Sequence, residues 1–109
     1  MAKNTVYLVS NGDARPPACV AGWPLQEQTL GQVAKALKKL GYSAVMLPKH
    51  DEKRKHGFLM SQREGTAAFR GMDPDAPVIV VLNIWAFAHH VAGPLQTHRG
   101  PILLLANFD

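Results

Sequence analysis

The fold is decided by residues 78–90, whose sequence is VIVVLNIWAFAHH. The first part, residues 78–82, is an unbroken apolar run rich in β-branched side chains and bounded by Pro77. Such a run is typical of a strand that is buried on both faces of a parallel sheet. The second part carries side chains that a buried strand does not need, namely Asn83, Trp85, His89 and His90. The stretch therefore predicts a central strand whose carboxyl end bears functional residues.

Three other segments have the apolar, β-branched composition of strands: residues 5–10, 42–47 and 102–106. The most regular helical pattern covers residues 24–40, where apolar side chains recur at helical spacing. Pro24 suits the first turn of that helix, where its missing N–H costs nothing, and Gly41 suits the position just after the last turn. The prolines and the lack of any period over residues 14–22 predict a long loop before this helix.

Two shorter helices are also predicted. One covers residues 58–70, although Gly65 weakens it by about 1 kcal/mol relative to alanine. The other is expected around residues 91–98, where a Gly-Pro pair limits its start. The chain thus alternates strand and helix, and right-handed crossovers then require a parallel sheet with helices on both faces. We expect one domain, residues 1–109, with a three-layer flavodoxin- or Rossmann-like α/β fold and a four-stranded sheet of order 2-1-3-4.

The last predicted strand, residues 102–106, looks buried by its composition, yet no helix follows to cover it. Residues 5–10 and 78–82 take the central places in the sheet, because they are among the most uniformly apolar strands. An uncovered apolar edge strand tends to pair with another polypeptide. The sequence therefore predicts a chain that is truncated or is completed by a partner, and a homo-oligomer is one such solution.

Composition and charge limit the classes of function. With 109 residues, 47% hydrophobic and 18% charged side chains, the chain has the composition of an ordinary globular domain. No apolar run approaches the roughly 20 residues of a membrane span, no secretory signal is recognisable, and a single cysteine, Cys19, agrees with a reducing compartment. We expect a cytoplasmic protein without a membrane partner.

We interpret the charged tract at residues 49–56 as a solvated loop, since it contains its own acids. Nucleic-acid binding ranks lower, because no aromatic residues are interleaved for base stacking.

Polar side chains follow the two strands predicted to lie at the centre. In open parallel sheets, ligands bind beyond the carboxyl ends of the strands where the strand order reverses. The residues at that point are Asn11, Asp13 and Arg15 after the first strand, and Asn83, Trp85, His89 and His90 after the third. Arg15 offers a planar guanidinium to a carboxylate, a phosphate or a pair of hydroxyls, unless it only pairs with Asp13. Trp85 offers a flat wall for a sugar ring or a base, unless it only packs against the core.

These residues predict a polar ligand but not a complete reaction. His89 and His90 are adjacent, so their rings diverge, and together with His98 they do not give a standard zinc spacing. Neither the Gly-x-x-x-x-Gly-Lys-Ser/Thr loop nor the Gly-x-Gly-x-x-Gly turn follows the first strand, so the two common nucleotide motifs are absent. Cys19 has no reactive motif around it and is interpreted as a buried, inert thiol.

Four loop patterns, taken in order, resemble those of a known family. They are NGDARPP at residues 11–17, WPLQEQT at residues 23–29, NIW followed by two histidines in residues 83–90, and GPILLLANFD at residues 100–109. Together they cover nearly the whole chain. In this order they resemble the amino-terminal domain of L-fucose/L-arabinose isomerase-type proteins.

The resemblance implies a Rossmann-like piece of a larger enzyme. Family members are metal-dependent aldose–ketose isomerases, usually with Mn²⁺, that have several domains and assemble into trimers or hexamers. Their amino-terminal domain contacts substrate across a subunit interface, and the matching positions here are Arg15 and Trp85, which are candidates for closing over sugar hydroxyls. The metal ligands of the family lie in later domains and have no counterpart in this chain. Isomerisation requires a divalent ion and a carboxylate that moves the proton, so the chain is not expected to isomerise a sugar alone.

Two hypotheses of function remain. The first is a non-catalytic domain that contacts a sugar or polyol, supports assembly and needs a C-terminal catalytic domain. The second is a free-standing module for a small molecule or a protein, since a fold does not fix a function. A companion chain with the metal ligands would favour the first, and a homodimer that buries the last strand but leaves the carboxyl edge open would favour the second. Neither hypothesis assigns a catalytic residue, a metal site or a cofactor to this chain.

Overall fold

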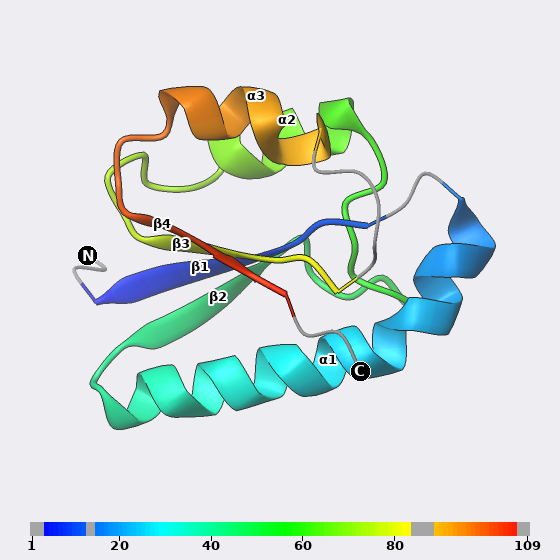
Figure 1. The fold of residues 1–109 in the computed structure, drawn as a ribbon, viewed down its shortest axis with the longest axis horizontal. Coiled ribbons are helices and arrows are strands. Elements are labelled where there is room, and N and C mark those ends of the chain that lie inside the picture. Colours follow the sequence, from blue (N-terminus) through cyan, green and yellow to red (C-terminus); the bar gives the residue numbers. More distant parts are fainter. Residues whose placement is uncertain (1–3, 13–14, 84–88, 107–109) are drawn as a thin grey trace.

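The computed structural model describes residues 4–12, 15–83 and 89–106, and it confirms the predicted α/β fold (Figure 1). Four strands form one all-parallel sheet in the order β2-β1-β3-β4. The strands are β1 (Thr5–Ser10), β2 (Ser43–Leu47), β3 (Val78–Val81) and β4 (Ile102–Leu105). The helices are α1 (Pro16–Lys39), α2 (Gln62–Arg70) and α3 (His89–Thr97). Helix α1 covers one face of the sheet, and α2 and α3 cover the other, which gives the three layers of a flavodoxin-like fold.

The two central strands are buried on both faces, because their side chains alternate between the two helical layers. Strands β1 and β3 pair in register from Tyr7 with Val78 to Ser10 with Val81. The side chains that pack on the α1 side are Val6, Leu8, Ile79 and Val81. Those that pack on the opposite side are Val9, Val78 and Val80. The prediction that the most apolar strands lie at the centre is confirmed.

Helix α1 begins earlier than predicted, at Pro16 instead of Pro24, so the loop expected over residues 14–22 is wrong from Pro16 onward. Pro16 and Pro17 occupy the first helical positions, where no N–H is needed, and Pro24 lies inside the helix. The buried face has helical spacing and consists of Cys19, Trp23, Gln26, Thr29 and Leu30. Because two of these residues, Gln26 and Thr29, are polar, the apolar periodicity of this helix is not evident in the sequence. Gly41, with φ of 90°, follows the last turn as predicted.

The helix predicted over residues 58–70 is shorter in the structure. Helix α2 begins after Ser61, whose hydroxyl accepts the N–H of Glu64 at 3.1 Å and so caps the first turn. Phe58 and Leu59 are not helical, and each is only 1% exposed. Their apolar side chains fit the pattern of a helix start, but their burial comes from contacts with distant parts of the chain.

Helix α3 confirms the helix predicted around residues 91–98. It starts two residues earlier, at His89, and the Gly93-Pro94 pair lies within it instead of limiting its start. Within the described ranges, no helix is both long enough and apolar enough to cross a membrane.

Strand β4 is exposed, although the sequence predicts a buried strand. Ile102, Leu103 and Leu104 are 43%, 54% and 57% exposed. They point to both faces of the sheet, because Ile102 lies beside Val78 and Leu103 lies beside Ile79 in the parallel register. The helices lie over the inner strands and leave this edge of the sheet open (Figure 1). Among the described residues, no helix or loop therefore covers the apolar side chains of Ile102, Leu103 and Leu104.

Candidate functional site

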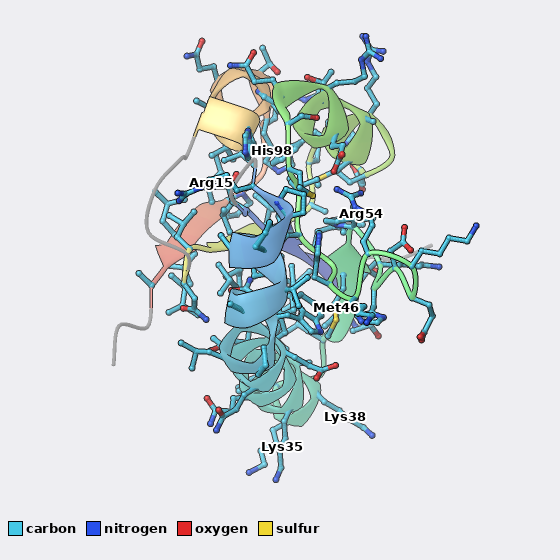
Figure 2. The ribbon with its side chains drawn as sticks, turned by 90° about the vertical axis from the view of Figure 1, so that its right-hand side faces the viewer. Arg15, Lys35, Lys38, Met46, Arg54 and His98 are labelled. Atoms are coloured by element: carbon cyan, nitrogen blue, oxygen red, sulfur yellow. The ribbon has the colours of Figure 1, made fainter. Side chains whose placement is uncertain are left out.

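The predicted site residues follow β1 and β3, whose carboxyl ends lie side by side because Ser10 pairs with Val81. Figure 2 looks onto this edge of the sheet and shows Arg15 above the start of α1. Asn11 comes directly after β1, and Asn83 follows β3. The topology thus brings the carboxyl ends of the first and third strands together, as predicted. Three further predictions lie outside the described residues, and they concern Asp13, Trp85 and the side chain of His89.

Asn11 is only 1% exposed, because another segment of the chain closes over it. Asn11 and Leu59 form a parallel bridge, and the N–H of Gly12 donates to the carbonyl of Leu59 at 2.9 Å. The N–H of Leu59 in turn donates to the carbonyl of Ser10 at 2.8 Å. A Cβ at Gly12 would lie 2.6 Å from the Cβ of Phe58. These contacts make Asn11 part of the wall behind the edge, and its contact with a ligand stays a prediction.

Asn83 joins a polar group on α1 that the sequence reasoning missed. Its side-chain amide donates to the hydroxyl of Thr29 at 2.9 Å, and that hydroxyl donates to a carbonyl of its own helix at 2.9 Å. Gln26 is fully buried, and its amide donates to the carbonyl of Val81 at 3.3 Å. Among the described residues, Oε1 of Gln26 has no hydrogen-bond partner. Helix α1 therefore holds the carboxyl end of β3 with side-chain hydrogen bonds. In the sequence, Gln26 and Thr29 share the helical spacing of the buried face of α1. Two polar residues at such positions are the signal that could have identified this group.

Arg15 is exposed and directly precedes α1. A helix N-terminus usually offers free backbone N–H groups to an anion. Here the first two helical positions are Pro16 and Pro17, which have no N–H, and the N–H groups of Ala18 and Cys19 donate to the carbonyl of Arg15 at 3.1 and 3.3 Å. The backbone is therefore poorly suited to cradle a phosphate. The guanidinium of Arg15 is the donor that this position offers to a ligand.

The histidines lie at different places. His90 is 4% exposed and borders a hollow of about 220 Å³ together with Gln62 and Thr66. His98 lies at the other end of α3, where its Nε2 is 2.7 Å from the carbonyl oxygen of Ala76. The described ranges contain no group of three His, Cys, Asp or Glu side chains that could hold a metal ion.

The charged tract is a folded loop, residues 48–60, whose lysine side chains are exposed as predicted. Arg54 pairs with Glu64 of α2, and its Nη2 donates to both carboxylate oxygens at 3.2 Å. The backbone N–H groups of Lys53 and Arg54 donate to the carboxylate of Asp51 at 2.9 and 3.3 Å. These two hydrogen bonds lower the pKa of Asp51. The ion pair ties the loop to the helical layer above the sheet.

His56 belongs to this charged loop but is only 2% exposed, which the sequence reasoning missed. Its Nδ1 accepts the N–H of Phe58 at 3.0 Å, so the ring is neutral and carries its proton on Nε2. Burial lowers the pKa of His56, and the positive charge of Arg54 lowers it further. Trp23 lies against the same segment, with its ring centroid 5.2 Å from Phe58 and 5.5 Å from His50. No local pattern in the sequence marks this histidine as buried.

Cys19 is fully buried, as predicted for an inert thiol. At the carboxyl ends of β1 and β3, the described residues therefore present the exposed guanidinium of Arg15 beside side-chain amides and a hydroxyl that hold the strand ends. Such groups bind and orient hydroxyls or carboxylates. No family model, curated protein or solved structure matches the chain.

Proposed function

We propose that this chain is a non-catalytic, sugar-contacting domain of the fucose/arabinose isomerase type, which works as part of an assembly. The observation that carries the proposal is the exposed Arg15 at the point where the strand order reverses, next to a helix start whose prolines do not favour phosphate. A guanidinium fork suits a pair of neighbouring hydroxyls. A polyol or sugar is the ligand class that fits this donor.

In this proposal Trp85 forms the apolar wall of the sugar site, and Asp13 and His89 lie around it. A sugar contact of His90 is not part of the proposal, because this residue is only 4% exposed. Asn83 acts from behind, because its amide is hydrogen-bonded to Thr29. Arg15 offers a guanidinium, which orients oxygens but does not move protons at neutral pH. The proton transfer and the Mn²⁺ of an isomerase would therefore belong to a companion catalytic domain.

The assembly surface in this proposal is β4, and its partner is a second copy of this chain. Its apolar side chains point to both faces, so a flat surface on one side would leave half of them in water. Antiparallel pairing of two β4 strands about a two-fold axis covers both faces, with the two copies of Leu103 opposite each other and Ile102 opposite Leu104. A four-residue strand is about 13 Å long, much less than a stable interface of about 800 Å² per partner needs. The pairing is therefore expected to be reversible.

The sugar site is tested by titration at pH 7.5 with L-fucose, L-arabinose and their alditols, with and without Mn²⁺. We expect a saturable, metal-independent change of tryptophan fluorescence with a millimolar midpoint, which Trp85→Phe removes. Arg15→Gln is expected to weaken binding by about tenfold, the effect of losing one charge-assisted contact. Arg70→Gln, which changes an exposed arginine at the opposite edge, is the matched control. A sugar response that is absent at tens of millimolar, or unchanged in Arg15→Gln, contradicts the proposal.

The assembly surface is tested by sedimentation velocity over a range of protein concentrations. Wild type is expected to show a concentration-dependent dimer, and Leu103→Lys is expected to remain monomeric because two lysines would face each other across the axis. Leu40→Lys, at a position 72% exposed on another part of the surface, should behave like wild type. A wild type that stays monomeric at the highest concentration, or a dimer that survives Leu103→Lys, rules out this pairing.

A further inference from the structure

A groove of about 350 Å³ lies between α2 and α3, at the end of these helices that is remote from the candidate sugar site. Helix α2 leads from the carboxyl end of β2 back to the start of β3, so its last turn lies at the amino edge of the sheet. The last turn of α3 lies there as well, since it leads into β4. The groove is lined by Thr66, Phe69, Arg70, Pro74, Gly93, Pro94, Thr97 and His98. We call it the α2–α3 groove.

The floor of the α2–α3 groove is held in place by two loops that bind each other. The N–H groups of Arg99 and Gly100 both donate to the carbonyl of Pro74 at 3.0 Å. His98 lies 2.7 Å from the carbonyl of Ala76 through Nε2, and since a carbonyl only accepts, this nitrogen carries the proton. The His98 ring also packs edge-on against Phe69, with centroids 5.8 Å apart. The aromatic part of the groove is therefore fixed before any ligand arrives.

The charged group of the α2–α3 groove is Arg70, which is exposed in the last turn of α2. Other arginines are engaged: Arg99 pairs with Asp75 at 3.0 Å, and Arg54 pairs with Glu64 at 3.2 Å. Among the described residues, no salt bridge is formed by Arg70. None of the lining residues is acidic. A guanidinium without a carboxylate partner, next to an apolar wall, is suited to a ligand that brings its own carboxylate.

We propose that the α2–α3 groove binds a small aromatic carboxylate. The carboxylate would take the guanidinium fork of Arg70, with the hydroxyl of Thr66 as a further donor; the hydroxyl of Thr97 already donates to the carbonyl of Pro94 at 3.2 Å. The ring would lie on the apolar wall that Phe69 and Pro94 help to form. The volume is at the lower end of the range for ligand pockets, about 300–1,000 Å³, so a single-ring molecule fits better than a dinucleotide. This site is separate from the carboxyl edge, and it does not depend on the proposed sugar function.

Benzoate is the probe, and amide chemical shifts of the full chain are the readout. We expect benzoate to shift the amides of Thr66, Arg70 and Thr97 with a millimolar dissociation constant. Benzamide, which has the ring without the charge, and acetate, which has the charge without the ring, are each expected to bind about tenfold more weakly. Inorganic phosphate tests whether charge alone suffices. Equal binding of phosphate and benzoate contradicts the aromatic part of the proposal.

Arg70→Gln is expected to weaken benzoate binding by about tenfold. Arg70→Lys should give an intermediate loss, because lysine keeps the charge but loses the fork. Arg63→Gln is the matched control, since Arg63 is exposed on the same helix and does not line the groove. Arg15→Gln should leave benzoate binding unchanged, which separates this site from the sugar site. The proposal is overturned if benzoate shifts no groove amide at tens of millimolar, or if Arg70→Gln and Arg63→Gln have the same effect.

Discussion

Replacing Gly65 by alanine is expected to destabilise the fold by about 3 kcal/mol, at the upper end of the range for overpacked sites. Gly65 is buried in α2 where this helix crosses α3, and a Cβ there would overlap the carbonyl oxygen of His90. The position of this Cβ is set by the backbone of α2, and the carbonyl oxygen belongs to the backbone of α3. No side chain can therefore turn away to make room. The helices would have to separate, and the contacts between them would be lost. A domain of this size has about 5–15 kcal/mol of stability in total, so the loss is large.

The measurement is the free energy of unfolding in urea, followed by circular dichroism. Gly31→Ala is the matched control, because a Cβ at this position meets nothing within 4 Å. Gly31 lies in helix α1, so alanine should stabilise the fold by about 0.5–1 kcal/mol. Gly65→Ala gains the same helix propensity. A decrease in its free energy of unfolding is therefore due to the close approach of α2 and α3. A Gly65→Ala protein as stable as Gly31→Ala would show that the helices do not approach this closely.

The strands and their order could be predicted because the information is local or topological. The run of Val78, Ile79, Val80 and Val81 identifies a strand buried on both faces, and alternating strands and helices leave few arrangements of a parallel sheet. The start of α2 was also available in the sequence, because Ser61 and Glu64 have the spacing of a capping box. The apolar residue Phe58 obscures this signal, because it extends the apparent helical pattern toward the amino terminus.

The remaining features depend on contacts between distant segments, and no local pattern carries them. Leu59 is buried because it pairs with Asn11 beyond the end of β1, so its extended conformation comes from tertiary contacts. The exposure of β4 likewise depends on where the helices lie. The composition of a strand indicates that its side chains are apolar, but it does not indicate which element covers them.

The same distinction applies to the candidate site. Its place at the carboxyl edge follows from topology alone, and the structure puts Asn11 and Asn83 there. The roles of individual side chains do not follow from topology. The hydrogen bond from Asn83 to Thr29 spans 54 positions of sequence and gives Asn83 a role in supporting the end of β3; its contact with a ligand stays a prediction. Among the described candidates whose side chains are placed, Arg15 is exposed, Asn83 is half-buried, and Asn11 and His90 are buried.

Mild acid is expected to loosen the loop of residues 48–60 through His56. The Nδ1 of His56 must stay unprotonated to accept the N–H of Phe58, and protonation would place a charge at a position only 2% exposed. The charged groups that act on His56 are Arg54 and His50, which lower its pKa, and Glu64 and Asp51, which raise it; burial is the largest effect, and the net direction is downward. The folded state therefore binds this proton less readily than the unfolded chain.

The sign of the pH effect follows from this difference. The unfolded chain takes up the proton near the ordinary histidine pKa of about 6.5, whereas the folded chain takes it up only at lower pH. The contribution of neutral His56 to stability is complete above about pH 6.5 and is lost as the pH falls from there through the pKa of the folded state. One proton changes the free energy of unfolding by at most about 1.4 kcal/mol per pH unit. The lowered pKa of Asp51 acts in a separate pH window, since its contribution to stability is lost only as the pH falls below the ordinary aspartate pKa of 3.8.

The fluorescence of Trp23 reports this loop, because its ring packs against Phe58 at 5.2 Å. In a Trp85→Phe background, emission and urea stability measured between pH 7.5 and 5 are expected to change in wild type and much less in His56→Asn, whose side-chain oxygen can accept the same N–H. His50 also lies close to Trp23, at 5.5 Å between ring centroids, so His50→Gln is the control that must keep the stability change. Equal pH dependence in wild type and His56→Asn would contradict the role of His56. Because this loop pairs with Asn11 at the carboxyl edge, loss of its packing in acid should also abolish any sugar response seen at pH 7.5.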